Sequence, residues 1–256
     1  MKTLFVAAGI AALLVAAARP VAAAETDNAT RIGRVSAVKV PPADDAAFRS
    51  GVRAFNTCLK EHGETWTWTL WDSVTANGNM YYAASFGHHW SDFDAKNAAG
   101  KACRSVFTSK VMPHFTKSKD MFLVNQPGLA HWKNGDWKYF HLYFLRIKPG
   151  RGHDFRSTMK KIAEAAKKEN WLPFDVEEIR GGGKGAADYV VEAPFMKWAD
   201  LGKDNPSMKD MLVKAYGEQE GKQTLDTLMD VIKKGWDQYI GYDKDLSYHP
   251  AKKSSD

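Results

Sequence analysis

Apolar residues in the first half of the chain recur at spacings that predict alternating strands and helices. Arg34 to Val40 alternates as a strand, and Pro41-Pro42 ends it because proline donates no hydrogen bond to a neighbouring strand. Apolar positions at helical spacing follow, namely Ala47, Phe48, Val52, Phe55 and Leu59. The remaining predicted elements are a strand over 65–74, an Asn77-Gly78 turn, a strand over 80–86, a helix over 95–117 that Pro113 can interrupt, and a strand over 121–125.

The second half repeats this order of strand, helix, strand, strand, helix and strand. Its predicted elements are a strand over 137–147, a helix over 154–169, strands over 174–179 and 188–193, a helix over 208–234 interrupted near 217–221, and a strand over 238–242. Matching residues lie 107 positions apart (155 − 48): Val40 and Ile147, Pro42 and Pro149, Phe48 and Phe155, Arg49 and Arg156, Ser50 and Ser157, Tyr82 and Tyr189. After a slip of one residue, Trp90-Ser91-Asp92-Phe93 matches Trp198-Ala199-Asp200-Leu201. Such an internal repeat indicates two similar modules.

Two consecutive units with this order resemble the dimeric α+β barrel superfamily, which includes antibiotic-biosynthesis monooxygenase-like, EthD-like and NIPSNAP-like proteins. The resemblance covers residues 33 to about 245 and rests on element order and duplication, without a diagnostic motif. It implies an α+β fold in which two tandem ferredoxin-like βαββαβ units, 33–130 and 131–246, pack sheet to sheet. The fused pair would form a dimeric α+β barrel within one chain, with the helices on its outer faces.

Residues 1–24 have the features of a cleaved secretory signal peptide. Lys2 supplies a positive charge, and an apolar run extends from Leu4 to Ala18 before a group of small residues. A run of roughly 15 residues is short for a membrane span, although an uncleaved anchor is the alternative. We therefore expect an exported protein, periplasmic or extracellular, without stable membrane insertion after cleavage. Residues 25–32 are expected to be a flexible N-terminus and 247–256 a polar tail.

The charge of the chain argues against a nucleic-acid partner. The formal net charge is +6, and removal of Lys2 and Arg19 with the signal peptide leaves +4 (6 − 2). This excess is spread over many lysines, whereas nucleic-acid binding usually needs a clustered basic surface. The glycine-rich run 181–185 lies between two predicted strands, so we interpret it as a hairpin turn rather than a phosphate-binding loop.

The two cysteines, Cys58 and Cys103, are candidates for a disulfide, because paired cysteines tend to be oxidised outside the cytoplasm. Two separate buried thiols are the alternative. The superfamily resemblance favours the disulfide, since it places the end of the first helix beside the start of the second.

The space between the two sheets is the expected ligand pocket. Six strand aromatics are candidates for its wall: Trp66, Trp68, Tyr82, Tyr139, Tyr143 and Tyr189. The alternative is that these side chains simply fill the core of the barrel. His141 lies among them and is the candidate acid or base, because histidine titrates near neutral pH. A structural histidine is the alternative.

The second unit also carries four acidic residues on or beside its strands, where the first unit has mostly aromatic ones. These are Asp175, Glu177, Glu178 and Glu192. A buried carboxylate must be paired or neutralised, so any that faces inward is a site candidate. Exposure at a sheet edge is the simpler alternative.

No metal or cofactor is predicted. The run His88-His89-Trp90-Ser91-Asp92-Phe93-Asp94 resembles a metal site by residue type, but the sequence fixes no further ligand. Some members of the superfamily bind haem through a helix histidine. In the second unit His153 precedes the predicted helix and His249 follows the last strand, while His114 lies late in the first unit. No serine-hydrolase elbow, zinc-protease motif or dinucleotide fingerprint is present.

Our leading hypothesis is therefore an exported protein that binds a small apolar or aromatic molecule between its two sheets. The alternative is a cofactor-independent enzyme of the monooxygenase or isomerase type that uses His141. A second alternative is a structural or interaction module whose barrel is completely filled. An interior cavity of roughly 300 Å³ with His141 on its wall would favour the first two. The sequence predicts no further oligomeric state.

Overall fold

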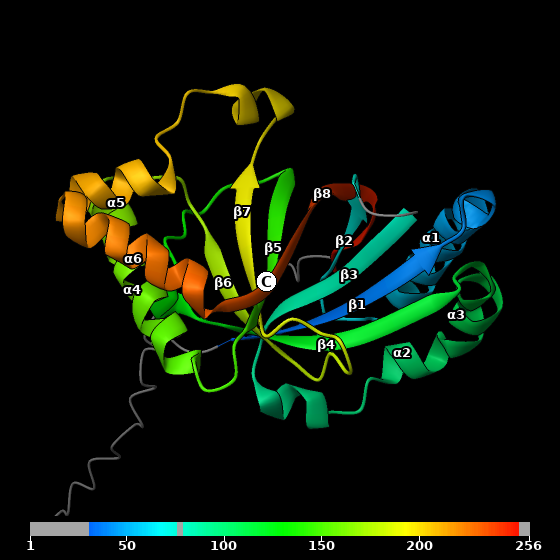
Figure 1. Ribbon diagram of the computed structural model, residues 1–256. Helices are drawn as coiled ribbons and strands as arrows, with labels where there is room; N and C mark the ends of the chain where they lie inside the picture. The colour runs from blue at the N-terminus through cyan, green and yellow to red at the C-terminus, as the bar shows by residue number, and fades with distance from the viewer. Residues whose placement is uncertain (1–30, 76–78, 251–256) are drawn as a thin grey trace, which may run out of the picture.

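The computed structural model describes residues 31–75 and 79–250. The expected signal peptide over 1–24, the Asn77-Gly78 turn and residues 251–256 lie outside these described residues. In the described part of the chain, eight strands form one closed barrel, and the longer helices lie on its outside (Figure 1). No helix among these residues is long and apolar enough to cross a membrane.

The first unit has the predicted order of elements, but its second helix is broken into short pieces. The elements are β1 (Ile32–Val40), α1 (Asp45–Glu61), β2 (Trp68–Ser73), β3 (Asn79–His88), α2 (Ala98–Ala102), α3 (Arg104–Lys110) and β4 (Lys117–Asn125). Helix α2 ends at Cys103, and a 3₁₀ turn at Met112–His114 follows α3. Pro113 lies in that turn, where its missing N–H prevents an α-helix from continuing.

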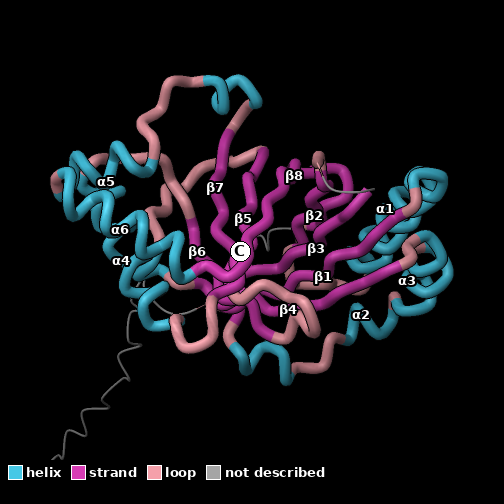
Figure 2. The backbone as a smooth tube through the Cα atoms, viewed as in Figure 1, coloured by secondary structure: helices cyan, strands magenta, loops and turns pink. Residues whose placement is uncertain are grey.

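The second unit repeats the order, and only its second helical segment is longer than that of the first unit (Figure 2). Its elements are β5 (Tyr139–Ile147), α4 (Gly152–Lys168), β6 (Asp175–Arg180), β7 (Tyr189–Phe195), α5 (Met208–Tyr216), α6 (Glu218–Val231) and β8 (Ile232–Tyr248). Gly217 separates α5 from α6 at a φ of +85°, a conformation that favours glycine. Strand β8 starts directly after α6 and is much longer than the predicted 238–242. Helix α4 begins earlier than predicted and includes His153, whose side chain is 87% exposed.

The two sheets join edge to edge to close the barrel. One sheet has the strand order β4-β1-β3-β2 and the other β8-β5-β7-β6. β2 pairs with β8 and β4 pairs with β6, both antiparallel, so each seam joins the second strand of one unit to the last strand of the other. This reciprocal pairing confirms the predicted fold of two ferredoxin-like units in one barrel. Closure also leaves no unpaired sheet edge.

Each strand contributes to two different layers of the core. Inward side chains from both sheets form one cluster, which includes Val35, Leu123, Phe140, Leu142 and Ile240. On the outer faces, α1 and α3 cover the first sheet, whereas α4, α5 and α6 cover the second (Figure 1). The fold therefore offers two kinds of place for a ligand, inside the barrel or between a sheet and its helices.

The repeat is out of register by one residue at the third strand. Tyr81 contacts Phe48 with ring centroids 4.8 Å apart, and Tyr189 contacts Phe155 in the same way at 4.5 Å. Tyr81 is therefore the structural equivalent of Tyr189, and the predicted match of Tyr82 with Tyr189 is wrong. A shift of one residue moves a side chain to the opposite face of a strand. Tyr82 accordingly faces the barrel interior, whereas Tyr189 lies beneath α4.

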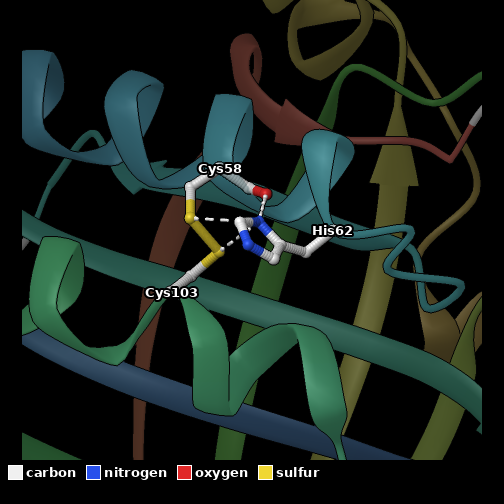
Figure 3. A group of neighbouring side chains, drawn as sticks. All are labelled: Cys58, His62 and Cys103. Carbon is white, nitrogen blue, oxygen red and sulfur yellow. Dashed lines mark hydrogen bonds between the residues drawn. A yellow bond between two sulfur atoms is a disulfide. The ribbon is translucent and has the colours of Figure 1, made fainter.

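The predicted disulfide between Cys58 and Cys103 is confirmed, with sulfur atoms 2.11 Å apart (Figure 3). It links α1 to the junction of α2 and α3. His62 Nδ1 lies 3.0 Å from the Cys58 carbonyl oxygen and 3.7 Å from each sulfur. A crosslink of this kind typically stabilises a protein by about 2–4 kcal/mol.

Candidate functional site

The barrel interior contains a cavity of only about 100 Å³, which we call the barrel cavity. Its wall is formed by Val35, Trp71, Tyr82, Ala84, Phe86, Met121, Leu123, Phe140, Leu142, Phe144, Val190, Glu192 and Ile240. Of the six predicted pocket aromatics, Tyr82 alone is in this wall, where its hydroxyl accepts a hydrogen bond from Gln238 Nε2 at 2.6 Å. The cavity between the sheets is therefore smaller than the roughly 300 Å³ that a ligand pocket there would need.

His141 and its two tyrosine neighbours face away from this cavity. Phe140 and Leu142 point into the barrel, so the alternation of the strand turns Tyr139, His141 and Tyr143 outward. Their predicted place between the sheets is wrong because the more apolar set of β5 is the buried one.

His141 is held in a hydrogen-bonded chain on the outer surface. Its Nε2 lies 2.7 Å from Asp237 Oδ2, and its Nδ1 lies 2.7 Å from the Tyr143 hydroxyl. The ring also stacks on Tyr239 at 3.9 Å. Tyr143 is 40% exposed, and burial of the rest of its ring raises its pKa to about 12. These contacts hold the His141 ring in place, and His141 lines neither the barrel cavity nor the larger cavity of the first unit.

The other three predicted aromatics lie on the helix-covered faces. Tyr189 is buried against Phe155 under α4. Trp66 stacks on His88 with centroids 3.8 Å apart. Burial lowers the pKa of His88, whose Nε2 lies 2.7 Å from Ser85 Oγ. Trp68 is different, because it lines a second and larger cavity.

This larger space, the sheet–helix cavity, has a volume of about 310 Å³ and lies between the first sheet and helices α1 and α3. Its lining is mostly apolar and comprises Arg34, Ser36, Val38, Phe48, Val52, Phe55, Asn56, Leu59, Trp68, Leu70, Ala83, Gly100, Arg104, Phe107, Val111, Phe115 and Leu246. Such a lining suits a small hydrophobic molecule, because ligand cavities usually combine apolar walls with a few polar groups.

The cavity exists because the helical layer of the first unit is thin. Helices α2 and α3 contain 5 and 7 residues, whereas α5 and α6 in the second unit contain 9 and 14. The longer pair places Met211, Leu212, Leu228 and Val231 against the second sheet. On the first helix of each unit, the smaller Val52 also stands where the second unit has Met159.

Four polar residues lie in the wall of the sheet–helix cavity. Asn56 is fixed by a hydrogen bond from Nδ2 to the Leu246 carbonyl at 2.9 Å, and Ser36 Oγ donates to the carboxylate of Asp120. Arg34 and Arg104 are exposed, and among the described residues neither guanidinium has a hydrogen-bond or ion-pair partner. Two unpaired guanidinium groups form a suitable binding place for a carboxylate, sulfonate or phosphate.

A more polar pocket of about 300 Å³ adjoins this cavity and shares Arg34 and Trp68 with it. Its floor includes buried Glu64, which accepts hydrogen bonds from the backbone N–H groups of Thr65 and Trp66 at 2.8 and 3.0 Å. Asn97 Nδ2 donates to the same carboxylate at 2.8 Å. The two spaces together offer an apolar compartment beside a polar one.

Sequence reasoning missed Arg34, Asn56 and Arg104. Asn56 gave a usable signal, because it interrupts the apolar stripe of α1 between Val52 and Leu59. The arginines gave none, since exposed basic residues are common, and only the tertiary fold brings both of them to one cavity.

Three of the four acidic residues of the second unit face into the barrel. Strand pairing places Asp175 opposite Glu192 and Glu177 opposite Val190, all on the inner face, while Glu178 lies on the outer face and pairs with Arg180. Burial raises the pKa of Glu177 to about 10, with Glu192 and Asp175 adding repulsion. Burial also raises the pKa of Glu192 to about 8 and that of Asp175 above its usual range.

The residues of the sheet–helix cavity do not suit haem. Its lining offers no imidazole, thiolate, thioether or phenolate side chain to serve as an axial ligand. Among residues 31–75 and 79–250, three metal-ligating side chains gather at Cys58, His62 and Cys103, where the two sulfurs are bonded to each other.

Comparison with known proteins supports the fold. Neither a protein-family model nor a curated protein matches the sequence. A candidate monooxygenase from Fusobacterium nucleatum is similar in structure, with a TM-score of 0.54 and 12% identity over 87% of this chain and 95% of its own. A second candidate monooxygenase, from Lactobacillus acidophilus, has a TM-score of 0.52 and 14% identity over 86% and 97%. Chlorite dismutase from Candidatus Nitrospira defluvii has a TM-score of 0.54 and 7% identity over 84% and 92%.

An anthrone oxidase-like protein is also similar, with a TM-score of 0.50 and 8% identity over 84% of this chain and 92% of its own. At these identities the likeness establishes a shared fold and nothing more. The match to nearly the whole length of each structure agrees with a barrel formed from two similar halves.

Proposed function

We propose that this protein is an exported member of the dimeric α+β barrel superfamily that binds a small, largely apolar molecule carrying an anionic group. The ligand occupies the sheet–helix cavity of the first unit rather than the space between the sheets. The observation that carries this proposal is an apolar cavity of about 310 Å³ with Arg34 and Arg104 in its wall.

Size and lining distinguish this cavity from the barrel cavity. Small-molecule sites usually measure roughly 300–1,000 Å³, so the sheet–helix cavity falls at the lower end and the barrel cavity falls below it. Phe48, Phe55 and Phe107 supply aromatic contacts, and the two arginines select for a negatively charged group on the ligand.

Export is supported by the Cys58–Cys103 disulfide, since such bonds persist mainly in oxidising compartments. The signal-like sequence over 1–24 points to the same compartment. A binding protein there would meet its ligand outside the cytoplasm.

Fluorescent probes test the binding site directly. We expect the anionic probe 8-anilinonaphthalene-1-sulfonate to bind and brighten, and the Arg34→Gln, Arg104→Gln double variant to weaken it by about tenfold, as loss of a charge-assisted contact predicts. The neutral probe N-phenyl-1-naphthylamine serves as a control, and its affinity should change little in that variant.

A filling substitution locates the probe. Val52→Met introduces the residue found at the same place in the second unit and should reduce binding of both probes without unfolding the protein. The matched control Met159→Val lies in the other unit and should leave binding unchanged. Equal loss in both variants would refute the site. Native mass spectrometry of protein purified from its own host would then identify a retained ligand.

An oxygenase activity is the second candidate, suggested by the structural likeness to candidate monooxygenases and an anthrone oxidase-like protein. Ser36 lies in the cavity wall and donates a hydrogen bond to exposed Asp120, so the Asp120 carboxylate would accept a proton from an electron-rich aromatic substrate through the Ser36 hydroxyl. Dioxygen would be the oxidant: a CH₂ group becomes C=O, one oxygen atom enters the product and the other leaves as water. Oxygen uptake in the presence of such a substrate would favour oxygenase activity over simple binding, provided that the Asp120→Asn variant loses this uptake.

A further inference from the structure

The barrel cavity has one acidic side chain in an otherwise apolar wall. Glu192 reaches it from β7, and Trp71, Tyr82 and Phe140 contribute aromatic rings. Phe86 lines the same cavity and is 48% exposed, so it marks the place where the cavity meets solvent. Among the described residues, Glu192 has no hydrogen-bond or ion-pair partner.

A second carboxyl beside it is also unsatisfied. Glu177 is 5% exposed, and its Oε2 has no hydrogen-bond partner. Asp175 lies opposite Glu192 on the neighbouring strand. Buried carboxylates are normally paired with a cation or fully hydrogen-bonded, so this group lacks the partner that burial requires.

Among the described residues, no basic side chain forms an ion pair with Asp175, Glu177 or Glu192. Around Glu192, β5 presents Leu142 and β6 presents Asp175 and Glu177, and β8 presents uncharged Gln238 on the far side of Leu142 in the same sheet. The charged groups that act on Glu177 are the two other acids. The barrel interior of the second unit therefore favours positive charge.

We propose that the barrel cavity binds a small organic cation, an amine or methylated ammonium group, against Glu192. Aromatic faces attract such cations through their ring electrons, and methylammonium groups are commonly held in cages of this kind. The size agrees, because an apolar cavity of about 150 Å³ holds benzene, and one of about 100 Å³ holds a group of four or five heavy atoms.

An organic cation fits better than a metal ion. The described residues bring three ligating atoms within 4.8 Å of one another at Cys58, His62 and Cys103, and not at Asp175, Glu177 and Glu192. The three carboxyls are thus too far apart to coordinate one ion, while the apolar wall suits methyl groups. Only the second unit is acidic, since Thr69, Trp71 and Ala84 occupy the matching inward positions of the first unit.

Calorimetric titration with tetramethylammonium chloride tests this site. Binding should release a proton, because the cation stabilises the ionised form of Glu192, whose pKa burial raises to about 8. Affinity should therefore rise by about tenfold from pH 7 to pH 9. The proton count comes from titrations in two buffers of different ionisation enthalpy, and tert-butanol is the uncharged control of similar shape.

Variants assign the cation to the proposed place. Glu192→Gln should weaken binding by at least about tenfold and remove its pH dependence, whereas Glu178→Gln, on the outer face of β6, should change neither. Trp71→Leu removes an aromatic wall and should weaken tetramethylammonium more than tert-butanol. Val52→Met should have no effect, which separates this site from the sheet–helix cavity.

Four results would overturn the proposal. They are the absence of tetramethylammonium binding at pH 9, equal binding of tert-butanol, proton uptake instead of release, and unchanged affinity in Glu192→Gln. Proton uptake would show that the protonated carboxyls donate hydrogen bonds to a neutral ligand.

Discussion

The two units of the barrel share one topology but fill their helix–sheet layers differently. In the second unit Phe155 and Ile162 on α4 meet two long helices and have no exposed surface. In the first unit Phe48 meets shorter helices and borders a cavity of about 310 Å³. The helix–sheet layer of the second unit is tightly packed, whereas that of the first unit encloses a cavity. A duplicated fold can thus keep its stability in one copy and develop a binding site in the other.

Truncation of the equivalent phenylalanines should show the largest contrast. Phe155→Ala is expected to reduce the free energy of unfolding by about 3–5 kcal/mol, because a fully packed site loses many contacts and leaves a new cavity. Phe48→Ala should cost about 1–2 kcal/mol less, since part of its surroundings is already empty. Urea unfolding measures both values. Equal losses would show that the first layer is as tightly packed as the second.

Removal of the disulfide should weaken the first unit in particular. The Cys58→Ser, Cys103→Ser double variant should lose about 2–4 kcal/mol, because the crosslink restricts the unfolded chain. Hydrogen exchange should accelerate more in α1 and α3 than in α4. Uniform acceleration over both units would contradict a local stabilisation of the first unit by the disulfide.

The inward carboxyls should make stability depend on pH. The pKa of Glu177 is about 10 in the folded protein against an ordinary value of 4.5, so the unfolded chain ionises first. The contribution of Glu177 to the free energy of unfolding is therefore greatest below about pH 4.5, and it falls as the pH rises toward 10.

We expect Glu177→Gln to reduce that decline by about 1–3 kcal/mol between pH 5 and pH 9, the usual cost of an unsatisfied buried group. Thermal unfolding at several pH values measures the slope. Glu178→Gln, which changes an outward carboxylate on the same strand, is the control and should retain the decline.

Exchange of Val52 and Met159 should give the smallest effect on stability. Val52→Met partly fills the sheet–helix cavity and should stabilise the protein by about 0.5–1 kcal/mol, while Met159→Val should cost about 1 kcal/mol. Differential scanning calorimetry resolves such differences. A destabilised Val52→Met protein would mean that the cavity is smaller or more rigid than described.

The order of elements and the duplication could be predicted from the sequence, because both follow from local periodicity. The disulfide needed the superfamily resemblance as well, because residue type alone left two separate thiols as the alternative. The sequence did not predict which side chains of each strand point into the barrel. Both faces of β5 are rich in aromatic residues, so alternation alone did not say that Phe140 rather than His141 points inward. The more apolar of the two alternating sets, Phe140 and Leu142, is the one that points inward. The match of Tyr82 with Tyr189 failed because one inserted residue reverses the facing of a strand.

The sheet–helix cavity was beyond sequence reasoning for a different reason. Its volume is a difference between two large quantities, the space enclosed by the elements and the space filled by side chains. The interruption near Pro113 could be predicted from the sequence, but the break at Cys103 that makes α2 and α3 short could not.

The C-terminal end of β8, in the second unit, packs against the first unit. Leu246 of β8 forms part of the wall of the sheet–helix cavity. Asn56 on α1 donates a hydrogen bond to the Leu246 carbonyl, and Arg49 on α1 forms an ion pair with Asp243 of β8 at 2.6 Å. The last strand of the second unit thus completes the wall of the sheet–helix cavity in the first unit. We expect a chain shortened after Tyr242 to lose that part of the wall, together with the contacts that Asn56 and Arg49 make with it.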